Sequence, residues 1–309
     1  MKYVKAGSLE KKSSAIIQGC MRIDNLTQSE IESLIRHDLE LGIEFFDHAD
    51  IYGGGVCEEK FGKVLKEYPE LRNQMVLQSK VGIAKGDGMN YFDFSKEYIV
   101  KAVEASLQRL NTDHLDYLLL HRPDALMEPE EVAAAFDQLE QQGKVHHFGV
   151  SNQNPMQMEL MKKCVKQPLK VNQMQLSVVH SGMIDEGIQV NTKFDGAVQC
   201  DGSMLNYSRI HDITLQCWSP FQYGAIQGVF IDNPDYPEVN AVLNQMAEKY
   251  GVTNSAIAIA WILRHPADMQ VIVGSCNQKR MESICKACDI TLQREDWYRI
   301  YKQAGNVIP

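Results

Sequence analysis

Three apolar stretches of the chain end in side chains that can gain or lose a proton. Residues 43–47 end in Asp47, residues 76–80 end in Lys80, and residues 117–121 end in His121. A fourth such side chain, Tyr52, follows Asp47 by five residues. In a barrel of parallel strands the carboxyl ends meet at one mouth, so these four residues are predicted to lie close together. We therefore expect the chemistry of the protein at that mouth.

The four side chains suit proton transfer to an oxygen atom. A tyrosine hydroxyl has a pKa of about 10 and is a poor acid at neutral pH, but a nearby ammonium group lowers that pKa by stabilising the phenolate. Lys80 is expected to supply the ammonium group, and Asp47 to hold Lys80 in place. His121 adds a hydrogen-bond donor. Together they would protonate an oxygen that gains negative charge, as happens when a carbonyl is reduced.

The remaining pattern predicts which elements position these residues. Apolar strand-like runs alternate with amphipathic helices, which is typical of a parallel sheet. Helices are expected to begin after Thr27, in the capping box Thr27-x-x-Glu30, and after Ser95. The predicted strands are residues 15–17, 43–47, 76–80, 117–121, 145–150, 171–175, 213–218 and 270–273.

Eight strands in a single pass favour a closed barrel over an open sheet. An open dinucleotide-binding sheet would carry a Gly-x-Gly-x-x-Gly turn after its first strand, and no such turn follows Ile17. The sequence therefore predicts an α/β fold of the (β/α)8 type, a TIM barrel. Residues 1–309 are expected to form one domain.

Four segments around these residues make the chain resemble the aldo-keto reductase family, in its bacterial, NADPH-dependent form. Residues 45–53 with Glu58 and Glu59 are similar to the family's first signature, and residues 78–80, 118–124 and 143–152 are similar to three later segments. The resemblance extends from about residue 14 to residue 309. It implies that Tyr52 is the general acid, that Asp47 and Lys80 tune it, and that His121 orients the carbonyl of an aldehyde or ketone.

The resemblance also implies a nicotinamide cofactor site without a glycine-rich turn. Ser151, Asn152 and Gln173 match positions that hold the nicotinamide carboxamide in the family. Trp218 matches an aromatic residue that lies against the nicotinamide ring. Ser219 and Pro220 complete the motif that Trp218 begins and belong to the same site. The segment that follows, from Phe221 to Gly224, should approach the pyrophosphate with backbone amides.

A third segment near the C-terminus concerns the choice of cofactor. Gly274, Ser275 and Arg280 resemble the segment that contacts the adenosine 2′-phosphate. Arginine suits a phosphate because its forked guanidinium donates charged hydrogen bonds. Many family members carry a lysine where this chain has Gly274, and an asparagine where it has Ile284. NADPH is therefore implied as the cofactor, and NADH stays open as an alternative.

The composition argues against several kinds of partner. The formal net charge is −9 and no basic stripe is present, which argues against nucleic acid. No run of about 18 apolar residues exists, so no membrane-spanning helix is expected. The first residues lack the apolar run of a secretion signal, which predicts a cytoplasmic location. There the eight cysteines, Cys285-x-x-Cys288 included, are expected to stay thiols instead of forming a redox pair or half a zinc site.

Two other functions fit part of the pattern. A non-catalytic NADPH-binding sensor or regulatory subunit of the same fold would share the cofactor site, but the full set of four residues favours an enzyme. A metal-dependent hydrolase would need clustered histidines at strand ends, where only His121 and His48 stand, and Lys80 would repel a cation. No metal site is expected.

The identity of the small carbonyl substrate does not follow from the sequence, and neither does the oligomeric state. The walls of the substrate pocket are expected in two weakly patterned loops, residues 85–94 and 181–206. The chain stops soon after a predicted helix at residues 294–303, which leaves little tail to close over a bulky substrate. A fairly open pocket is therefore expected.

Overall fold

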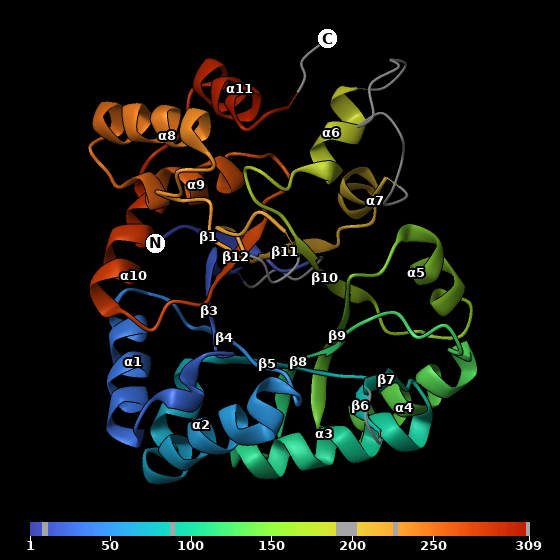
Figure 1. Ribbon diagram of the computed structural model, residues 1–309. Helices are drawn as coiled ribbons and strands as arrows, with labels where there is room; N and C mark the ends of the chain where they lie inside the picture. The colour runs from blue at the N-terminus through green and yellow to red at the C-terminus, as the bar shows by residue number, and fades with distance from the viewer. Residues whose placement is uncertain (8–11, 87–89, 190–202, 225–227, 307–309) are drawn as a thin grey trace.

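Parallel strands form a closed barrel at the centre of the protein. The computed structural model describes residues 1–7, 12–86, 90–189, 203–224 and 228–306. Eight of its strands close the barrel, and every neighbouring pair is parallel (Figure 1). The predicted strands and the TIM-barrel fold are confirmed. Around the barrel the strands are β10 (Leu169–Gln175), β11 (Thr214–Trp218), β12 (Gln270–Val273), β3 (Ile16–Gly19), β4 (Phe45–Asp47), β5 (Val76–Val81), β8 (Leu115–Leu120) and β9 (Val145–Ser151).

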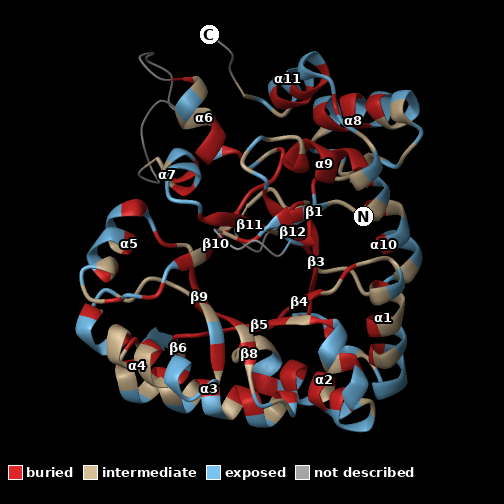
Figure 2. Ribbon diagram, turned by 180° about the vertical axis from the view of Figure 1, so that it is seen from behind, coloured by how far each residue is buried: buried red, intermediate tan, exposed pale blue. Residues whose placement is uncertain are grey.

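Helices surround the barrel and turn their buried sides toward it (Figure 2). The two predicted helix starts are confirmed, because Thr27 forms a capping box with Glu30 and Ser95 accepts a hydrogen bond from the backbone of Tyr98. The α-helices are α1 (Gln28–Glu40), α2 (Val56–Glu67), α3 (Lys96–Leu110), α4 (Pro129–Gln141), α5 (Pro155–Lys162), α6 (Gly182–Ile188), α7 (Met204–Ile210), α8 (Pro237–Tyr250), α9 (Asn254–Leu263), α10 (Gln278–Cys285) and α11 (Arg294–Gln303). Short 3-10 helices cover Ile23–Asn25, Tyr52–Gly55, Pro69–Gln74 and Lys286–Asp289.

Burial on both faces explains why the barrel strands are rich in apolar residues. Successive side chains of a strand point alternately into the barrel and toward the helices, and both environments exclude water. Full burial of one Val, Leu, Ile or Phe side chain contributes roughly 1.5–3 kcal/mol. The cluster inside the barrel consists of Ala6, Ile17, Phe45, Tyr117, Leu119, Val171 and Ile272.

The barrel closes between β3 and β12. Ile16 is paired with Val271, and the backbone N–H of Val271 donates to the carbonyl of Ala15 over 2.8 Å. Just before β3, the antiparallel strands β1 (Tyr3–Lys5) and β2 (Lys12–Ser14) form a hairpin at the amino end of the barrel. This hairpin was not predicted from the sequence, because strands of three residues show too little alternation.

Two segments that were expected to be loops contain regular structure. β6 (Ile83–Lys85) and β7 (Asn90–Phe92) pair as an antiparallel hairpin directly after β5. The expectation of a loop over residues 181–206 was wrong for α6, where Met183 and Ile184 give the helix a buried side. Residues 87–89 and 190–202 of these segments lie outside the described part of the chain.

The strand ends differ from the predicted ones by one or two residues. β8 ends at Leu120, so His121 is the first residue after the strand, whereas β5 continues past Lys80 to Val81. Both residues still lie at the carboxyl end of the barrel, where the sequence analysis placed them.

Two predictions made from the composition concern the cysteines and membrane-spanning helices. The described cysteines are all free thiols, and Cys285 and Cys288 lie at the end of α10 and in the following 3-10 helix. Cys200 lies outside the described residues. Among the helices of the described ranges, none is long and apolar enough to cross a membrane.

Candidate active site

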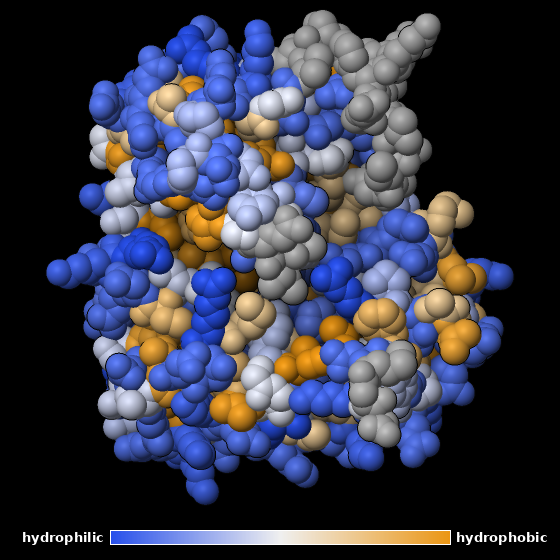
Figure 3. All heavy atoms as spheres, in the orientation of Figure 1, coloured by the Kyte–Doolittle hydropathy of each residue, from blue (hydrophilic) through white to orange (hydrophobic). Residues whose placement is uncertain are grey.

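A cavity of about 640 Å³ opens at the carboxyl ends of the barrel strands. In the space-filling view it lies in the recess near the middle of the face shown (Figure 3). Three of the four predicted catalytic residues line the cavity: Asp47, Tyr52 and His121. The fourth, Lys80, is completely buried beneath its floor.

Lys80 connects Asp47 with Tyr52. Its ammonium group lies 2.8 Å from Oδ2 of Asp47 and 3.0 Å from the hydroxyl of Tyr52. A third hydrogen bond, of 2.7 Å, goes to the carbonyl of His48. The three donors of an ammonium group are therefore all used, and its position is set by the last residue of β4 and by two residues of the segment that follows.

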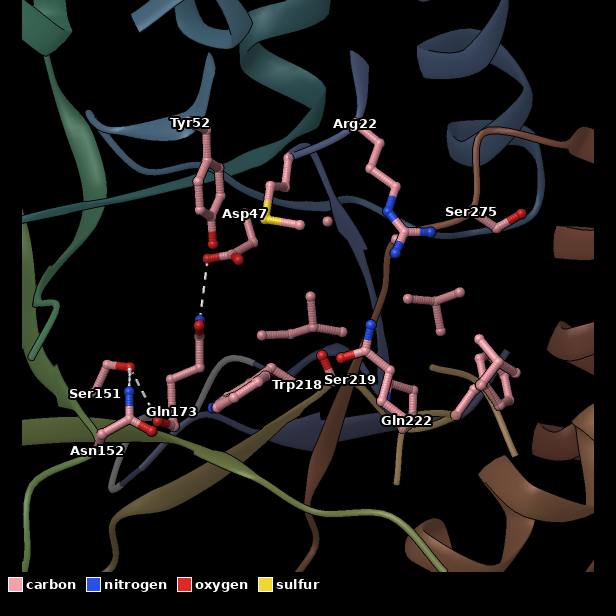
Figure 4. A pocket seen from close by; sticks show the side chains of 18 of the residues that line it. Arg22, Asp47, Tyr52, Ser151, Asn152, Gln173, Trp218, Ser219, Gln222 and Ser275 are labelled. Atoms are coloured by element: carbon pink, nitrogen blue, oxygen red, sulfur yellow. Dashed lines mark hydrogen bonds between the residues drawn. The ribbon is translucent and has the colours of Figure 1, made fainter. Parts of the chain in front are cut away.

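Three glycines after Tyr52 allow the chain to turn from β4 into α2. Gly53, Gly54 and Gly55 have φ angles of 56°, 69° and 100°, a region that favours glycine. Tyr52 begins this turn, and its backbone N–H donates to the carbonyl of Ala49. The turn holds the phenol at the cavity, where Figure 4 shows it beside Asp47.

The charges around Tyr52 give its pKa a direction opposite to the predicted one. Burial raises the pKa of Tyr52; the ammonium group of Lys80 lowers it, and the carboxylate of Asp47 raises it again. Together these effects place the pKa of Tyr52 above its ordinary value. The expected lowering was therefore wrong, because the loss of hydration outweighs the effect of the nearby ammonium group. Burial alone would lower the pKa of Lys80, but Asp47 and Tyr52 raise it overall, so Lys80 stays charged.

His121 faces Tyr52 as a neutral ring. The two ring centroids are 6.0 Å apart with the planes nearly perpendicular. Burial, reinforced by the positive charges of Lys80 and Arg122, holds the pKa of His121 well below its usual range. A neutral imidazole carries one N–H, which is a suitable hydrogen-bond donor to a carbonyl oxygen at the cavity.

A chain of buried glutamines holds Asp47 from inside the barrel. Oδ1 of Asp47 accepts hydrogen bonds from Gln78 and Gln173, over 2.7 and 3.1 Å. Gln78 also donates to Gln216, which donates to Gln270. Of these glutamines, only Gln173 was predicted from the sequence as a site residue. The recurrence of a glutamine in each of these four strands was the available signal.

Beside this network, Ser151, Asn152 and Gln173 form one wall of the cavity (Figure 4). Ser151 donates to the carbonyl of Gln173, and the amide nitrogen of Asn152 donates to Ser151 over 2.9 Å. The side-chain oxygens of Asn152 and Gln173 accept no hydrogen bond from any described residue. They are therefore available to a carboxamide nitrogen, which fits the nicotinamide expected there.

The segment that ends β11 continues this wall, because β11 is paired with β10 and Trp218 lies beside Gln173 (Figure 4). Trp218, Ser219, Pro220 and Phe221 line the cavity, and the buried indole nitrogen of Trp218 has no hydrogen-bond partner among the described residues. Gly224 is not among the residues that line the cavity, and its carbonyl accepts a hydrogen bond from Gln175.

The far end of the cavity carries positive charge. Gly274, Ser275 and Arg280 line it, as the sequence analysis expected of one site. Arg22, which that analysis missed, extends from the loop after β3 into the same end, where Figure 4 shows it near Ser275. Its place directly after a barrel strand was the signal that could have identified it. Arg22 adds a cation where the family's lysine is replaced by Gly274.

The positions of the histidines are relevant to the alternative of a metal-dependent enzyme. His48 is completely buried against Phe61, and burial lowers its pKa to about 3. Within the described ranges, one group of residues could hold a metal ion: His114, Asp116 and His146. It lies at the amino ends of β8 and β9, opposite the cavity, so it takes no part in the site described above.

The family assignment comes from comparison with known proteins. The model of the Aldo/keto reductase family matches residues 15–304. The chain belongs to this family. Oxidoreductase YdhF of Escherichia coli (strain K12) is 35% identical to this aldo-keto reductase over 91% of the chain and 89% of its own length. The 6-dehydroglucose reductase of Agrobacterium fabrum is 32% identical over 94% of both chains.

A solved structure shows the same fold. The thermostable aldo-keto reductase Tm1743, crystallised with the inhibitor epalrestat, superposes with a TM-score of 0.78 at 22% identity. The match covers 98% of this chain and 100% of that one. The aldo-keto reductase described here is therefore an oxidoreductase built on the (β/α)8 barrel of its family.

Proposed function

We propose that this aldo-keto reductase reduces small aldehydes or ketones to alcohols with NADPH, and that Tyr52 delivers the proton. The observation that supports the proposal best is the position of Lys80, whose ammonium group is hydrogen-bonded to both Asp47 and Tyr52. A buried cation beside a phenol at a cavity is suited to stabilising the phenolate that proton transfer leaves behind.

Each residue then has one task. A carbonyl oxygen between Tyr52 and His121 would accept hydrogen bonds from both, and the neutral ring of His121 would orient it. Tyr52, whose raised pKa keeps it protonated, gives its proton to that oxygen as negative charge develops. Lys80 stabilises the phenolate, and Asp47 keeps Lys80 in place. The nicotinamide cofactor, when bound, supplies the hydride.

The cavity walls fit such a cofactor. Asn152 and Gln173 offer unused amide oxygens to a carboxamide, and the ring of Trp218 lies beside Gln173 (Figure 4). At the far end, Arg22 and Arg280 suit phosphate groups. We prefer NADPH over NADH because backbone amides of the segment after Trp218 are expected at the pyrophosphate, which leaves both arginines for the adenosine 2′-phosphate. A cytoplasmic location stays a prediction.

The decisive test is Tyr52→Phe. Loss of the general acid should lower kcat at least about 100-fold, while the dissociation constant of NADPH, measured by fluorescence titration, should change little. Tyr298→Phe, at an exposed tyrosine of α11, is the matched control and should keep full activity. A Tyr52→Phe variant that kept more than about a tenth of the wild-type rate would contradict the assignment.

The substrate screen should cover several kinds of carbonyl compound. The name of the Agrobacterium relative, 6-dehydroglucose reductase, makes polyhydroxylated aldehydes one class to include. If the wild-type protein bound NADPH but reduced no carbonyl compound, the regulatory alternative would be favoured instead.

A further inference from the structure

Arg122 is a charged residue at the cavity for which the proposed reaction has no task. It follows His121 in the loop between β8 and α4, and its half-buried side chain lines the cavity. Its guanidinium carbon lies 5.7 Å from the centre of the Trp218 ring. Within the described part of the chain, its side chain has no ion pair and no hydrogen bond.

Most other partly buried arginines of the protein are neutralised, and Arg264, which has no ion pair among the described residues, donates to the carbonyl of Leu292. Arg72 is hydrogen-bonded to Asp116 over 2.9 Å, and Arg109 lies 2.7 Å from the buried carboxylate of Glu58. Removing a cation from water without a counter-charge is unfavourable, and structures usually avoid it. Arg122 is held in that condition at the mouth of the site, which suggests that its partner arrives with the ligand.

Arg122 lies close to the two residues that are proposed to hold the reacting carbonyl. Burial lowers its pKa, and Tyr52 opposes that change, which places the guanidinium within the electrostatic reach of the proposed general acid. It also contributes to the low pKa of His121. A ligand group bound by Arg122 would therefore lie close to a carbonyl held by Tyr52 and His121.

The other charges of the cavity leave Arg122 available. Asp47 is paired with Lys80, and Arg22 and Arg280 lie at the opposite end, where phosphate groups are expected. Asp232 is the other acidic residue among those lining the described cavity. The cavity thus carries an excess of positive charge, although the whole chain has a formal net charge of −9.

We propose that Arg122 binds a carboxylate of the substrate, and that the enzyme therefore acts on aldehydes or ketones that also carry a carboxylate group. This inference rests on the proposed carbonyl reduction and names its substrate class. A guanidinium matches a carboxylate with two parallel charged hydrogen bonds. During turnover the carbonyl carbon gains the hydride, its oxygen gains the proton of Tyr52, NADPH becomes NADP⁺, and the carboxylate is unchanged.

The test compares an acid with its neutral isostere. We expect wild-type kcat/KM to be at least about tenfold higher for 3- or 4-formylbenzoate than for the corresponding formylbenzamide, as a charged hydrogen bond predicts. Arg122→Met should remove the preference, mainly through KM, and Arg122→Lys should restore part of it. Arg299→Met, at an exposed arginine of α11, should keep the wild-type preference.

Binding separates this inference from the reaction itself. Calorimetry with NADP⁺ present should show that 4-(hydroxymethyl)benzoate binds the wild-type protein at least about tenfold more tightly than its amide, and that Arg122→Met removes the difference. Equal binding of acid and amide would overturn the inference, as would a preference for D-glyceraldehyde over both formylbenzoates. If no carbonyl compound were reduced, the proposed function would fail, while the binding comparison would still decide the role of Arg122.

Discussion

The two ends of the cavity are built differently. At the inner end, Asp47 and Lys80 are buried and fully hydrogen-bonded, and Tyr52 is bonded to Lys80. The outer end is the far end described above. There Arg22 and Arg280 are exposed, and their side chains have no ion pair with any described residue. The side chains of the inner end are held in place by protein groups alone. The arginines of the outer end are positioned to pair with an anionic ligand.

This difference indicates where each property of the enzyme resides. Proton transfer needs groups held in fixed geometry in a dry site, because the electrostatic stabilisation then requires no rearrangement. Phosphate binding tolerates flexible, hydrated cations. Changes at the inner end should therefore affect kcat, and changes at the outer end should affect cofactor affinity.

The largest effect is expected for Lys80→Met at the inner end. Without the ammonium group the phenolate of Tyr52 is less stable, so kcat should fall about 10²- to 10⁴-fold, with little change in NADPH affinity. The same loss raises the pKa of Tyr52 further, because Lys80 is the group that lowers it. In the reverse reaction, where the phenolate is needed, the pH of half-maximal alcohol oxidation should shift upward in a pH–rate profile.

Lys80→Met also leaves Asp47 as a buried charge without its cation, which should cost about 3–5 kcal/mol of unfolding free energy in a urea titration. The double variant Asp47→Asn with Lys80→Met removes both charges and should recover much of that stability but no activity. A double variant that regained the wild-type rate would show that the pair has a structural role only.

An intermediate effect is expected for Arg280→Met at the outer end. Loss of a charged hydrogen bond to the 2′-phosphate should weaken NADPH binding about 10- to 100-fold and NADH binding little, with kcat at saturating cofactor unchanged. Fluorescence titration with both cofactors measures the ratio, and Arg299→Met is again the control. Equal weakening of both cofactors would mean that Arg280 contacts the pyrophosphate instead.

The smallest effect is expected from salt. Exposed charges are screened at high ionic strength, so raising it from about 0.05 to 0.5 M should weaken NADPH binding a few-fold. The buried Lys80–Asp47 pair is screened much less, so kcat for a neutral aldehyde should stay nearly constant. A kcat that fell in parallel with affinity would contradict the separation of the two ends.

Much of this arrangement could be predicted from the sequence, because it depends on strand periodicity. Asp47, Lys80 and His121 were placed at one mouth simply because each lies at the end of an apolar run, and the barrel confirms that placement. The direction of the Tyr52 pKa could not be predicted in the same way. It depends on how much hydration the partly buried phenol loses, which only the packed structure reveals.

Other features were hidden because their partners are far apart in sequence. Gln216 and Gln270 are single polar residues in apolar strands, and their hydrogen bonds to each other appear only when β11 and β12 are neighbours. Arg22 reaches Ser275 only because β3 and β12 adjoin. That residues 1–309 form one domain, and that the cofactor residues act as expected, stay predictions.

The contact between β3 and β12 sets the moment at which the barrel can form during protein synthesis. Ile16 leaves the ribosome early and its partner Val271 leaves late. At synthesis rates of about 5–20 residues per second, roughly 10–50 s separate the two. Throughout that interval the unpaired edge of β3 can form hydrogen bonds with another chain. The yield of native enzyme should therefore depend on how well a chaperone shields β3, the first strand of the barrel, until β12 has been synthesised.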